Sequence, residues 1–350
     1  MIIDVFTRLP VKSLGQCKCV SKPWYSLISD PYFTKMHLKK ASSTNAVLIS
    51  TKFNPGSLYS VDFTNNFKNN SNCDGIASKL NFNLSNKWSI VWGSCNGLIL
   101  VESNRRSKFL LNPATLEFKK LPRFRSGYPS NSTYNYFGFG YDSSCDDYAV
   151  VVISNHCNFK KNACVFVYTL STNQWKKVGF SPYDHKLHRP TSGTYVAGSL
   201  HWLANNVNDS SLIIASFSIA DKEFSEVPLP KGIANLSFKV LRLGDFKGCL
   251  CLFTSVFNGG TECWLMKEYG VVESWMKLSF FLTEASWVVS LHLQEDSLVL
   301  LEGGQFVLLV STAIEVTLQR MTILGLPDDS RFGMTSVDSL VSPNSKNVNK

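Results

Sequence analysis

The chain of 350 residues has few charged side chains and no long hydrophobic run. Charged residues make up 17% of it, against 44% hydrophobic and 13% aromatic residues, which is too apolar for a disordered chain. Its apolar stretches, such as Phe306 to Val310, are far shorter than the ~18 residues that a membrane helix needs. Met1 is followed by Asp4 with neither a basic nor an extended apolar region, so we expect no secretory signal. The ten cysteines are irregularly spaced, which predicts free thiols in a protein of the cytoplasm, the nucleus or both.

Motifs of metal sites are also lacking. The six histidines include no His-x-His and no His-Glu-x-x-His pattern. His185 and His188 lie in a proline-flanked stretch, which predicts a solvated loop rather than a zinc site. The cysteine pairs have no second pair nearby, which favours small hydrophobic side chains over metal ligands in Cys17-x-Cys19 and Cys249-x-Cys251.

Catalytic motifs are missing as well. Asp142 to Asp147 concentrate carboxylates but lack the glycine and the closing glutamate of a calcium loop, which predicts a turn. Gly138-Phe-Gly140 precedes a strand pattern and not a helix, so it is not a phosphate-binding loop. A copper site would need His and Tyr ligands, for which no spacing signal exists. We therefore expect a non-catalytic chain without a metal or a cofactor.

The net charge of +9 is concentrated in two segments. Residues 1–41 carry +5 and residues 104–125 carry +6, whereas the remainder is slightly acidic. Neither segment interleaves its basic residues with stacking aromatics, which argues against nucleic-acid binding. An acidic protein partner for the first segment fits better, because complementary charge speeds and orients docking.

The first forty residues have helical periodicity. A short apolar pattern from Ile2 ends at Leu9-Pro10, and Ser13 and Ser21 are predicted N-caps of the next two helices. Asp30-Pro31 starts a fourth helical stretch. Helices this short cannot bury their apolar faces alone, so this head needs a partner, the body of the protein, or both.

From about Ala46 the pattern changes to short apolar or alternating runs separated by turn residues, which predicts antiparallel strands. Four segments end in an aromatic residue followed by polar residues and an apolar or Leu-Pro stop, with Phe118, Trp175, Phe224 and Trp275 as the anchors. A period near 50 residues predicts kelch-like blades of four strands, and such blades close into a ring. We expect a mainly β fold: a helical head and then a kelch-like β-propeller of six blades.

The head closely resembles the F-box of plant F-box proteins in Arg8-Leu-Pro-Val-Lys-Ser-Leu14, Cys19-Val-Ser-Lys-Pro-Trp-Tyr25 and Leu27-Ile-Ser-Asp-Pro-Tyr-Phe33. The body resembles the associated interaction domain of the same family. The matching stretches follow the family's order, and they are Gly93–Leu98, Leu111–Thr115, Phe137–Asp142, Gly198–Trp202, Trp264–Tyr269 and Ser339–Pro343. We divide the chain into an F-box (1–41), a propeller domain (42–343) and a polar tail (344–350).

The resemblance implies a substrate receptor of a Skp–cullin–F-box ubiquitin ligase, located in the cytoplasm or the nucleus, with no nucleic-acid or membrane partner. In that family the F-box binds an acidic Skp-type adaptor and through it cullin, while the second domain presents the protein to be ubiquitinated. The adaptor-facing role carries over to Ile3, Leu9, Pro10, Val11, Leu14, Val20, Trp24, Leu27 and Ile28. The alternative for Trp24 and Leu27 is that they form the core of the F-box and do not contact the adaptor.

Family F-boxes usually begin several residues earlier, with a Leu-Pro and acidic residues, so we expect this F-box to be short at its N-terminus. An alternative to the receptor role is therefore a truncated F-box protein that acts as a decoy. Another alternative is an adaptor-independent propeller that binds a protein or a glycan. The target is unknown, and immune and S-locus branches of the family are not separated by this sequence.

Candidate substrate loops are Gly127–Thr133, Ser154–Asn162, Ser181–Thr191 and Asn205–Ser210, since propellers bind through loops at one end of the ring. The basic window Asn104–Arg125 is either a substrate patch or a solvated blade edge.

Overall fold

The computed structural model describes residues 2–40, 45–51, 57–62, 75–82, 88–127, 133–156, 163–185, 192–233, 238–246, 248–256, 261–280, 291–292, 297–302, 305–311, 316–327 and 330–344. The head comprises four helices, α1 (Ile2–Phe6), α2 (Val11–Lys18), α3 (Lys22–Ile28) and α4 (Pro31–Lys40). In the described part of the chain every helix is too short or too polar to span a membrane.

Polar caps explain the starts of two helices, and a proline explains the start of a third. Ser21 caps α3 as predicted, because its Oγ accepts the backbone N–H of Trp24 at 3.3 Å. Asp30 does the same for α4, where its carboxylate accepts the N–H of Tyr32 at 2.8 Å. The cap predicted at Ser13 is wrong: α2 begins at Val11, directly after Pro10. A proline φ of −59° suits a helix start, and Pro10 needs no cap of its own.

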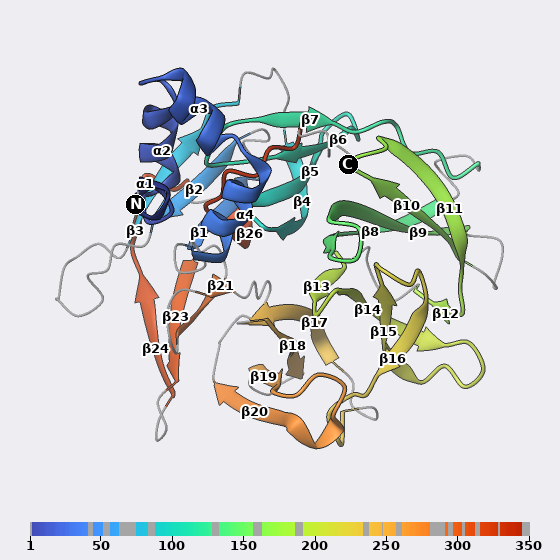
Figure 1. Ribbon diagram of the computed structural model, residues 1–350. Helices are drawn as coiled ribbons and strands as arrows, with labels where there is room; N and C mark the ends of the chain where they lie inside the picture. Colours follow the sequence, from blue (N-terminus) through green and yellow to red (C-terminus); the bar gives the residue numbers. More distant parts are fainter. Residues whose placement is uncertain are drawn as a thin grey trace.

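The described strands form six sheets arranged as the blades of a propeller, named here blades A to F (Figure 1). Blade A contains β26 (Ser330–Val337), β1 (Asn45–Thr51), β2 (Leu58–Asp62), β3 (Gly75–Leu80) and β25 (Ile323–Leu324). Blade B contains β4 (Trp88–Cys95), β5 (Leu98–Ser103), β6 (Lys108–Leu111) and β7 (Phe118–Lys120). Blade C contains β8 (Thr133–Asp142), β9 (Asp147–His156), β10 (Ala163–Thr169) and β11 (Gln174–Ser181).

Blade D contains β12 (Tyr183–Asp184), β13 (Thr194–Val196), β14 (Ser199–Asn206), β15 (Leu212–Ser218) and β16 (Phe224–Val227). Blade E contains β17 (Phe238–Phe246), β18 (Cys249–Val256), β19 (Thr261–Met266) and β20 (Trp275–Phe280), with the 3-10 turn η2 (Val272–Ser274) before β20. Blade F contains β21 (Leu291–His292), β22 (Ser297–Glu302), β23 (Gln305–Ser311) and β24 (Val316–Met321). Neighbouring strands are antiparallel except for β25, which pairs parallel with β3. The mainly β fold, the helical head and the propeller are thus confirmed.

Blade A closes the ring by joining strands from the two ends of the body. Its strand β1, the first after the helices, pairs antiparallel with β26, the last strand of the chain, from Asn45↔Val337 to Thr51↔Ser330. The backbone hydrogen bonds of this pair therefore join residues about 285 positions apart in the sequence. The ring is stable only when both strands are present, because an open blade would leave two strand edges unpaired.

The anchors of the predicted repeat lie in outermost strands. Consecutive blades B to E each contribute one, in β7, β11, β16 and β20. The indole N–H of Trp175 donates to the carbonyl of Pro122 at 2.9 Å, and that of Trp275 donates to the carbonyl of Pro228 at 2.9 Å. Each tryptophan thus bonds its own blade to the proline-containing connection that leaves the preceding blade, which carries a phenylalanine anchor.

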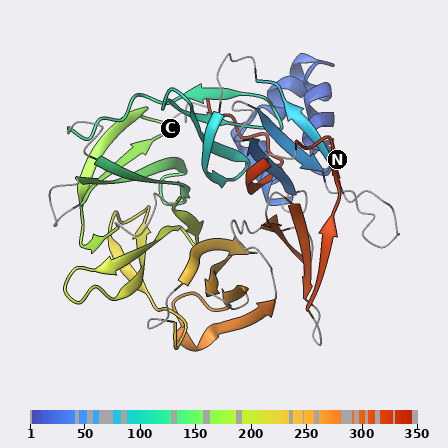
Figure 2. The ribbon, with the colours of Figure 1, turned by 180° about the vertical axis from the view of Figure 1, so that it is seen from behind.

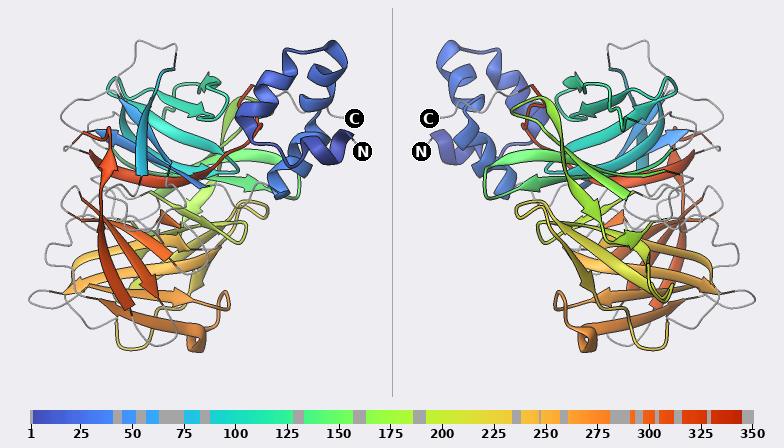
Figure 3. Two further views of the ribbon diagram at one scale, coloured as in Figure 1. Left: turned by 90° about the vertical axis from the view of Figure 1, so that its left-hand side faces the viewer. Right: turned by 90° about the vertical axis from the view of Figure 1, so that its right-hand side faces the viewer.

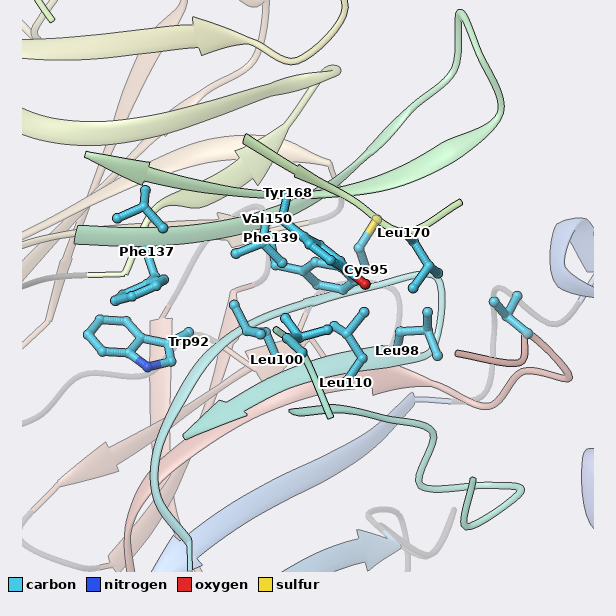
Figure 4. Packing of buried hydrophobic residues seen from close by; sticks show 13 residues of the cluster. Trp92, Cys95, Leu98, Leu100, Leu110, Phe137, Phe139, Val150, Tyr168 and Leu170 are labelled. Carbon is cyan, nitrogen blue, oxygen red and sulfur yellow. The ribbon is translucent and has the colours of Figure 1, made fainter. Parts of the chain in front are cut away.

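The core lies between the blades. Figure 4 shows the cluster between blades B and C, where Leu98, Leu100 and Leu110 face Phe139 and Val150. The leucines are fully buried, and each such side chain stabilises the fold by roughly 1.5–3 kcal/mol. Similar clusters separate the next blades, so the packing that holds the ring together runs around it from blade to blade.

The two faces of the ring differ. Figure 3 shows that the helices lie on one face, called the near face here, and Figure 2 shows the molecule from the other side, with the helices behind the sheets. Near-face turns include 96–97, 112–117, 143–146 and 219–223, since they contact the head, the segment 338–344 or each other. The opposite ends of the same strands, as at Ser103 and His156, belong to the far face.

Candidate functional site

The predicted adaptor-facing residues divide into surface and core. Val20 is 66% exposed and Ile3 is 43% exposed, and Pro10 is also exposed. Leu9, Trp24 and Leu27 are partly buried against the core of the head. These six side chains therefore remain candidates for contact with a partner.

The other three, Val11, Leu14 and Ile28, are at most 4% exposed and are buried inside the head. They pack with Phe6 and Phe33, so they build the helical head rather than its surface. The structure places these three in the core of the head, because helices of this length bury their apolar stripe against one another. Their contact with an adaptor stays a prediction.

Further exposed apolar side chains on the head were not among the predicted residues. They are Ile2, Val5, Tyr25 and Tyr32, with exposed fractions of 43% or more. Ile2 and Val5 belong to the apolar pattern of α1 and could have been found from it. Tyr25 and Tyr32 follow directly after Trp24 and Pro31, on helix faces that the apolar spacing left to solvent.

Basic residues flank Val20, which is the most exposed of the predicted adaptor-facing side chains. Val20 lies in the α2–α3 connection between Lys18 and Lys22. In the described structure no salt bridge is recorded for these two lysines or for Lys12, whereas Arg8 and Lys40 both pair with Asp4. These salt bridges hold the pKa of Asp4 below its usual range. The positive charge of the head is therefore available chiefly around the α2–α3 connection.

The head is attached to the ring by the segment 338–344, called the strap here. Leu340 is buried in the core of the head, and the next residue, Val341, is buried in the cluster between blades B and C. The side-chain amide of Asn112 donates to the carbonyls of Ser339 at 2.9 Å and Val341 at 2.7 Å. The strap thus lies between head and ring and contacts both.

Direct contacts between α4 and blade C add to this attachment. Lys35 forms a salt bridge with Asp146 in the β8–β9 turn, and Leu38 packs against the cluster between blades B and C. Burial alone would raise the pKa of Asp146, but the bonds from Lys35 and Tyr141 outweigh it and lower the pKa. The orientation of the head relative to the propeller is therefore set by several independent contacts.

The stretches that resemble the family meet one another at the near face. Besides its bonds to the strap, Asn112 accepts the N–H of Ala114 at 2.9 Å and so shapes its own turn. Gly97 has a φ of +82°, and a Cβ there would lie 2.5 Å from that of Ser339. The stretches Leu111–Thr115 and Gly93–Leu98 therefore both contact the strap where it passes blade B.

Two further stretches meet between blades D and E. His201 is fully buried, and its Nε2 lies 2.6 Å from the hydroxyl of Tyr269, which also lies 3.1 Å from Ser216 Oγ. His201 Nδ1 lies 3.1 Å from the carbonyl of Thr194, so Nδ1 carries the proton and Nε2 accepts from Tyr269. Burial lowers the pKa of His201 to about 4. This neutral histidine joins two blades and does not face solvent.

The paired glycines of Phe137–Asp142 allow close packing of blades C and D. Gly138 and Gly193 form an isolated bridge between the inner strands, and Gly193 donates to the carbonyl of Phe137 at 2.8 Å. A Cβ on Gly138 would lie 2.8 Å from the ring of Trp202, and a Cβ on Gly140 would lie 2.4 Å from the ring of Tyr195. These family stretches therefore contact one another or the strap, on the inner or near side of the ring.

The candidate substrate loops lie elsewhere. Each follows a strand end on the far face, but residues 128–132, 157–162 and 186–191 are outside the described residues. Ser154 and Asn155 are buried in β9, so that loop starts later than predicted. In the fourth loop, Asn205 and Asn206 end β14 and the turn 207–210 is exposed. The contacts described above for the family stretches therefore lie away from the described ends of these loops.

The residues weighed as metal ligands have other roles. Asp142 accepts from Ser144 N–H at 3.0 Å and pairs with Lys222 at 3.2 Å, which confirms the predicted turn. The solvated-loop interpretation of His185 is wrong: it is 1% exposed, its Nε2 lies 2.7 Å from Ser181 Oγ, and burial lowers its pKa to about 3. His188 is outside the described residues. In the part of the chain that the structure describes, no three His, Cys, Asp or Glu side chains form a group that could hold a metal ion.

The fold defines a class of protein: a head of four helices fixed to the near face of a β-propeller. Residues 1–36 match the F-box domain family, and residues 48–322 match the family described as F-box associated beta propeller domain. The chain belongs to the F-box proteins that carry this propeller domain, which confirms the resemblance seen in its sequence.

Similar proteins are plant F-box proteins. The chain is 31% identical over 302 residues to F-box protein CPR1 of Arabidopsis thaliana, with 79% of this chain and 71% of that protein covered. It is 30% identical over 315 residues to F-box/kelch-repeat protein At3g23880 of the same organism, with 86% and 84% covered. Proteins of this class serve in general as substrate receptors, without catalysis of their own, in Skp–cullin–F-box ligases.

Proposed function

We propose that this chain is the substrate-recognition subunit of a Skp–cullin–F-box ubiquitin ligase and that it binds a Skp-type adaptor through Val20 and the surrounding surface of the head. The observation that carries the proposal is a 66% exposed valine between two lysines on a matched F-box. An exposed apolar side chain with a basic rim suits an acidic partner that also buries apolar area.

The chain contributes position rather than chemistry. A protein held at the far face of the ring stays at a set distance and angle from the adaptor, because the strap and the Lys35–Asp146 salt bridge fix the head on the near face. Such tethering raises the effective concentration of a target beside a ubiquitin carrier. Transfer of ubiquitin to the target, and its subsequent degradation, belong to other subunits and to the proteasome.

The test is co-expression of residues 1–350 with a plant Skp-type adaptor, followed by size-exclusion chromatography and a binding titration. We expect co-elution of the wild-type chain. Val20→Asp should weaken the binding about tenfold or more, because it places an acid against an acidic partner and removes apolar area.

The matched control is Val207→Asp, since Val207 is also exposed, at 46%, but lies on the far face. It should leave adaptor binding unchanged. Failure of the wild-type chain to bind any adaptor would overturn the proposal and favour a propeller that binds its ligand without a ligase. Equal loss in the two variants would show that Val20 is not at the contact.

A further inference from the structure

Four exposed arginines lie on the far-face side of blade B. They come from the basic window and comprise two pairs, Arg105 with Arg106 and Arg123 with Arg125; we call them the arginine patch. The first pair is in the β5–β6 turn, beyond Ser103, and the second is in the segment that leaves β7. Four exposed guanidinium groups of this kind suit carboxylates, which they can bind in a bidentate manner.

The two pairs come from segments that run side by side. The backbone N–H of Leu121 donates to the carbonyl of Lys108 at 2.9 Å, which places the start of the second segment next to the end of the turn. Arg106 lies close enough to Lys108 to lower the pKa of that amine further, beside the larger effect of its burial. The arginine patch is therefore one surface and not two.

The second segment is held firmly. The ring of Phe124 packs against Phe166 and Trp175, with centroids 5.0 and 5.1 Å apart, and the Trp175 indole bonds the carbonyl of Pro122. Because Phe124 faces the cluster between blades B and C, Arg123 and Arg125 on either side of it lie at the surface. The backbone of this segment is therefore already ordered, so binding costs the freedom of the arginine side chains alone.

The turn holds Arg106 in a conformation that its side chain does not favour. Arg106 has a φ of +58°, where a residue with a Cβ is strained by roughly 1–2 kcal/mol. Lys222 is the other basic residue with a positive φ, and it pairs with Asp142. Among the described residues no salt bridge is recorded for Arg106, so the fold tolerates this arginine without a visible gain in stability. The same positive φ recurs in turns of other blades, as at Asn173 and Ser210, so it belongs to the turn geometry and does not itself mark a binding site.

The other basic residues of the window are largely occupied within the protein. Lys108 is half-buried, forms a salt bridge with Glu102 at 3.2 Å and lies over the ring of Phe137. Lys119 donates to the carbonyl of Leu170 at 3.3 Å. The structure thus separates a window of seven basic residues into structural lysines and the arginines of the patch, with Lys120 exposed beside them.

We propose that the arginine patch binds an acidic segment, rich in Asp and Glu, of the protein that the propeller presents. This inference rests on the proposed function and names the chemistry of its substrate. A protein segment is favoured over a nucleic acid because Phe124, the aromatic residue between the arginines, packs inside the protein and offers no stacking surface.

The test uses the full chain in complex with the Skp-type adaptor and, as the probe, a fluorescein-labelled peptide of alternating Glu and Asp. Anisotropy titrations at about 0.15 M salt should show binding. Arg105→Glu/Arg106→Glu and Arg123→Glu/Arg125→Glu should each weaken the affinity about tenfold or more, which is ~1.4 kcal/mol or more. A neutral peptide of Gln and Asn should not bind.

Lys176→Glu/Lys177→Glu is the matched control, because it reverses the same number of charges at an exposed pair on blade C. It should change the affinity by about twofold or less. The proposal is overturned if this control loses as much affinity, if the wild-type chain does not bind the peptide, or if an oligonucleotide of equal charge binds more tightly. Each variant is also tested for co-elution with the adaptor, which binds the head in the proposed function. A variant that co-elutes with the adaptor but does not bind the peptide has lost the patch alone, whereas a wild-type chain that binds no adaptor contradicts the proposed function.

Arg106→Gly supplies a second, independent readout. Relief of the positive φ should keep or raise the melting temperature, while the peptide affinity falls about threefold or more. A purely structural Arg106 would show unchanged affinity, and that result would also overturn the proposal. Loss of affinity in a variant that is no less stable than the wild type cannot come from misfolding.

Discussion

Leu340 and Val341 are neighbours in the chain, yet their side chains are buried in two different cores. Leu340 completes the helical head, and Val341 completes the cluster between blades B and C. The strap follows directly after β26, the strand that closes the ring with β1. Closure of the propeller and packing of the head therefore depend on the same short stretch of chain.

Leu340→Ala should loosen the head while the ring remains intact. Leu340 is 6% exposed, and removal of a buried leucine side chain costs about 2–5 kcal/mol. Most of that loss should fall on the four helices, since Leu340 packs among their side chains. Hydrogen exchange of the backbone amides should therefore become faster in α2 and α4 and stay unchanged in β9 and β10.

The control is Leu324→Ala, because Leu324 is 53% exposed at the edge of blade A. It should change stability by about 0.5 kcal/mol or less. Unaltered exchange in the head of the Leu340 variant would show that the helices fold without the strap.

Trp175→Phe should weaken the contact between blades B and C. The substitution removes the indole N–H and leaves the carbonyl of Pro122 without that donor, at a cost of about 1–3 kcal/mol. Trp275→Phe should have a similar effect between blades D and E. The two losses should add in the double variant, since the sites share no contact.

Trp264→Phe is a useful comparison, because the Trp264 indole bonds Glu262 inside blade E, at 3.3 Å. Urea unfolding measures the total loss, and amide exchange of β7 locates it. We expect faster exchange in β7 for Trp175→Phe alone. The same exchange rate in all three variants would mean that the tryptophan bonds do not join blades.

The repeat was predictable because its signal is local. Each anchor lies a few residues from its own turn and stop, as in Trp175-Lys-Lys-Val178, so the pattern survives in a linear sequence. Blades A and F give no such signal, and in blade A strands from the two ends of the body lie side by side, as β1 and β26 do. The expected six blades therefore depended on ring closure, because the motif itself occurs four times.

Burial within the head was harder to predict. Leu14 and Val20 are both apolar residues of the F-box pattern, but one is fully buried and the other is 66% exposed. Their difference arises from packing between helices and from Leu340, which is more than 300 residues away in the sequence. The burial of His185 had no local signal either, because it depends on Tyr136 and Trp202 in other strands.

Tyr269→Phe should destabilise the junction of blades D and E by about 1–3 kcal/mol. The variant removes the hydroxyl that donates to His201 Nε2 and leaves a buried acceptor unpaired. Thermal unfolding measures the effect at pH 7.5. Tyr25→Phe serves as the control, because Tyr25 is 58% exposed on the head and should show no change. An equally small effect at Tyr269 would contradict a role for this bond in joining the blades.

Stability should fall as the pH drops from about 6.5 toward 4. Burial lowers the pKa of His201 to about 4 and that of His185 to about 3, whereas an unfolded histidine has a pKa near 6.5. Between these values the unfolded chain binds more protons than the folded chain, so acid favours unfolding. Each histidine should contribute about 2 kcal/mol of loss between pH 6.5 and pH 5.

Asp245 acts in the opposite direction, because burial raises its pKa to about 6 and its protonation in acid favours the folded chain. A comparison of the wild-type chain with His185→Gln removes this contribution, since both chains contain Asp245. The melting temperature should fall less steeply below pH 6.5 in the variant. Parallel curves for the two chains would show that His185 takes up a proton as readily in the folded protein as in the unfolded chain, which its burial against Tyr136 and Trp202 argues against.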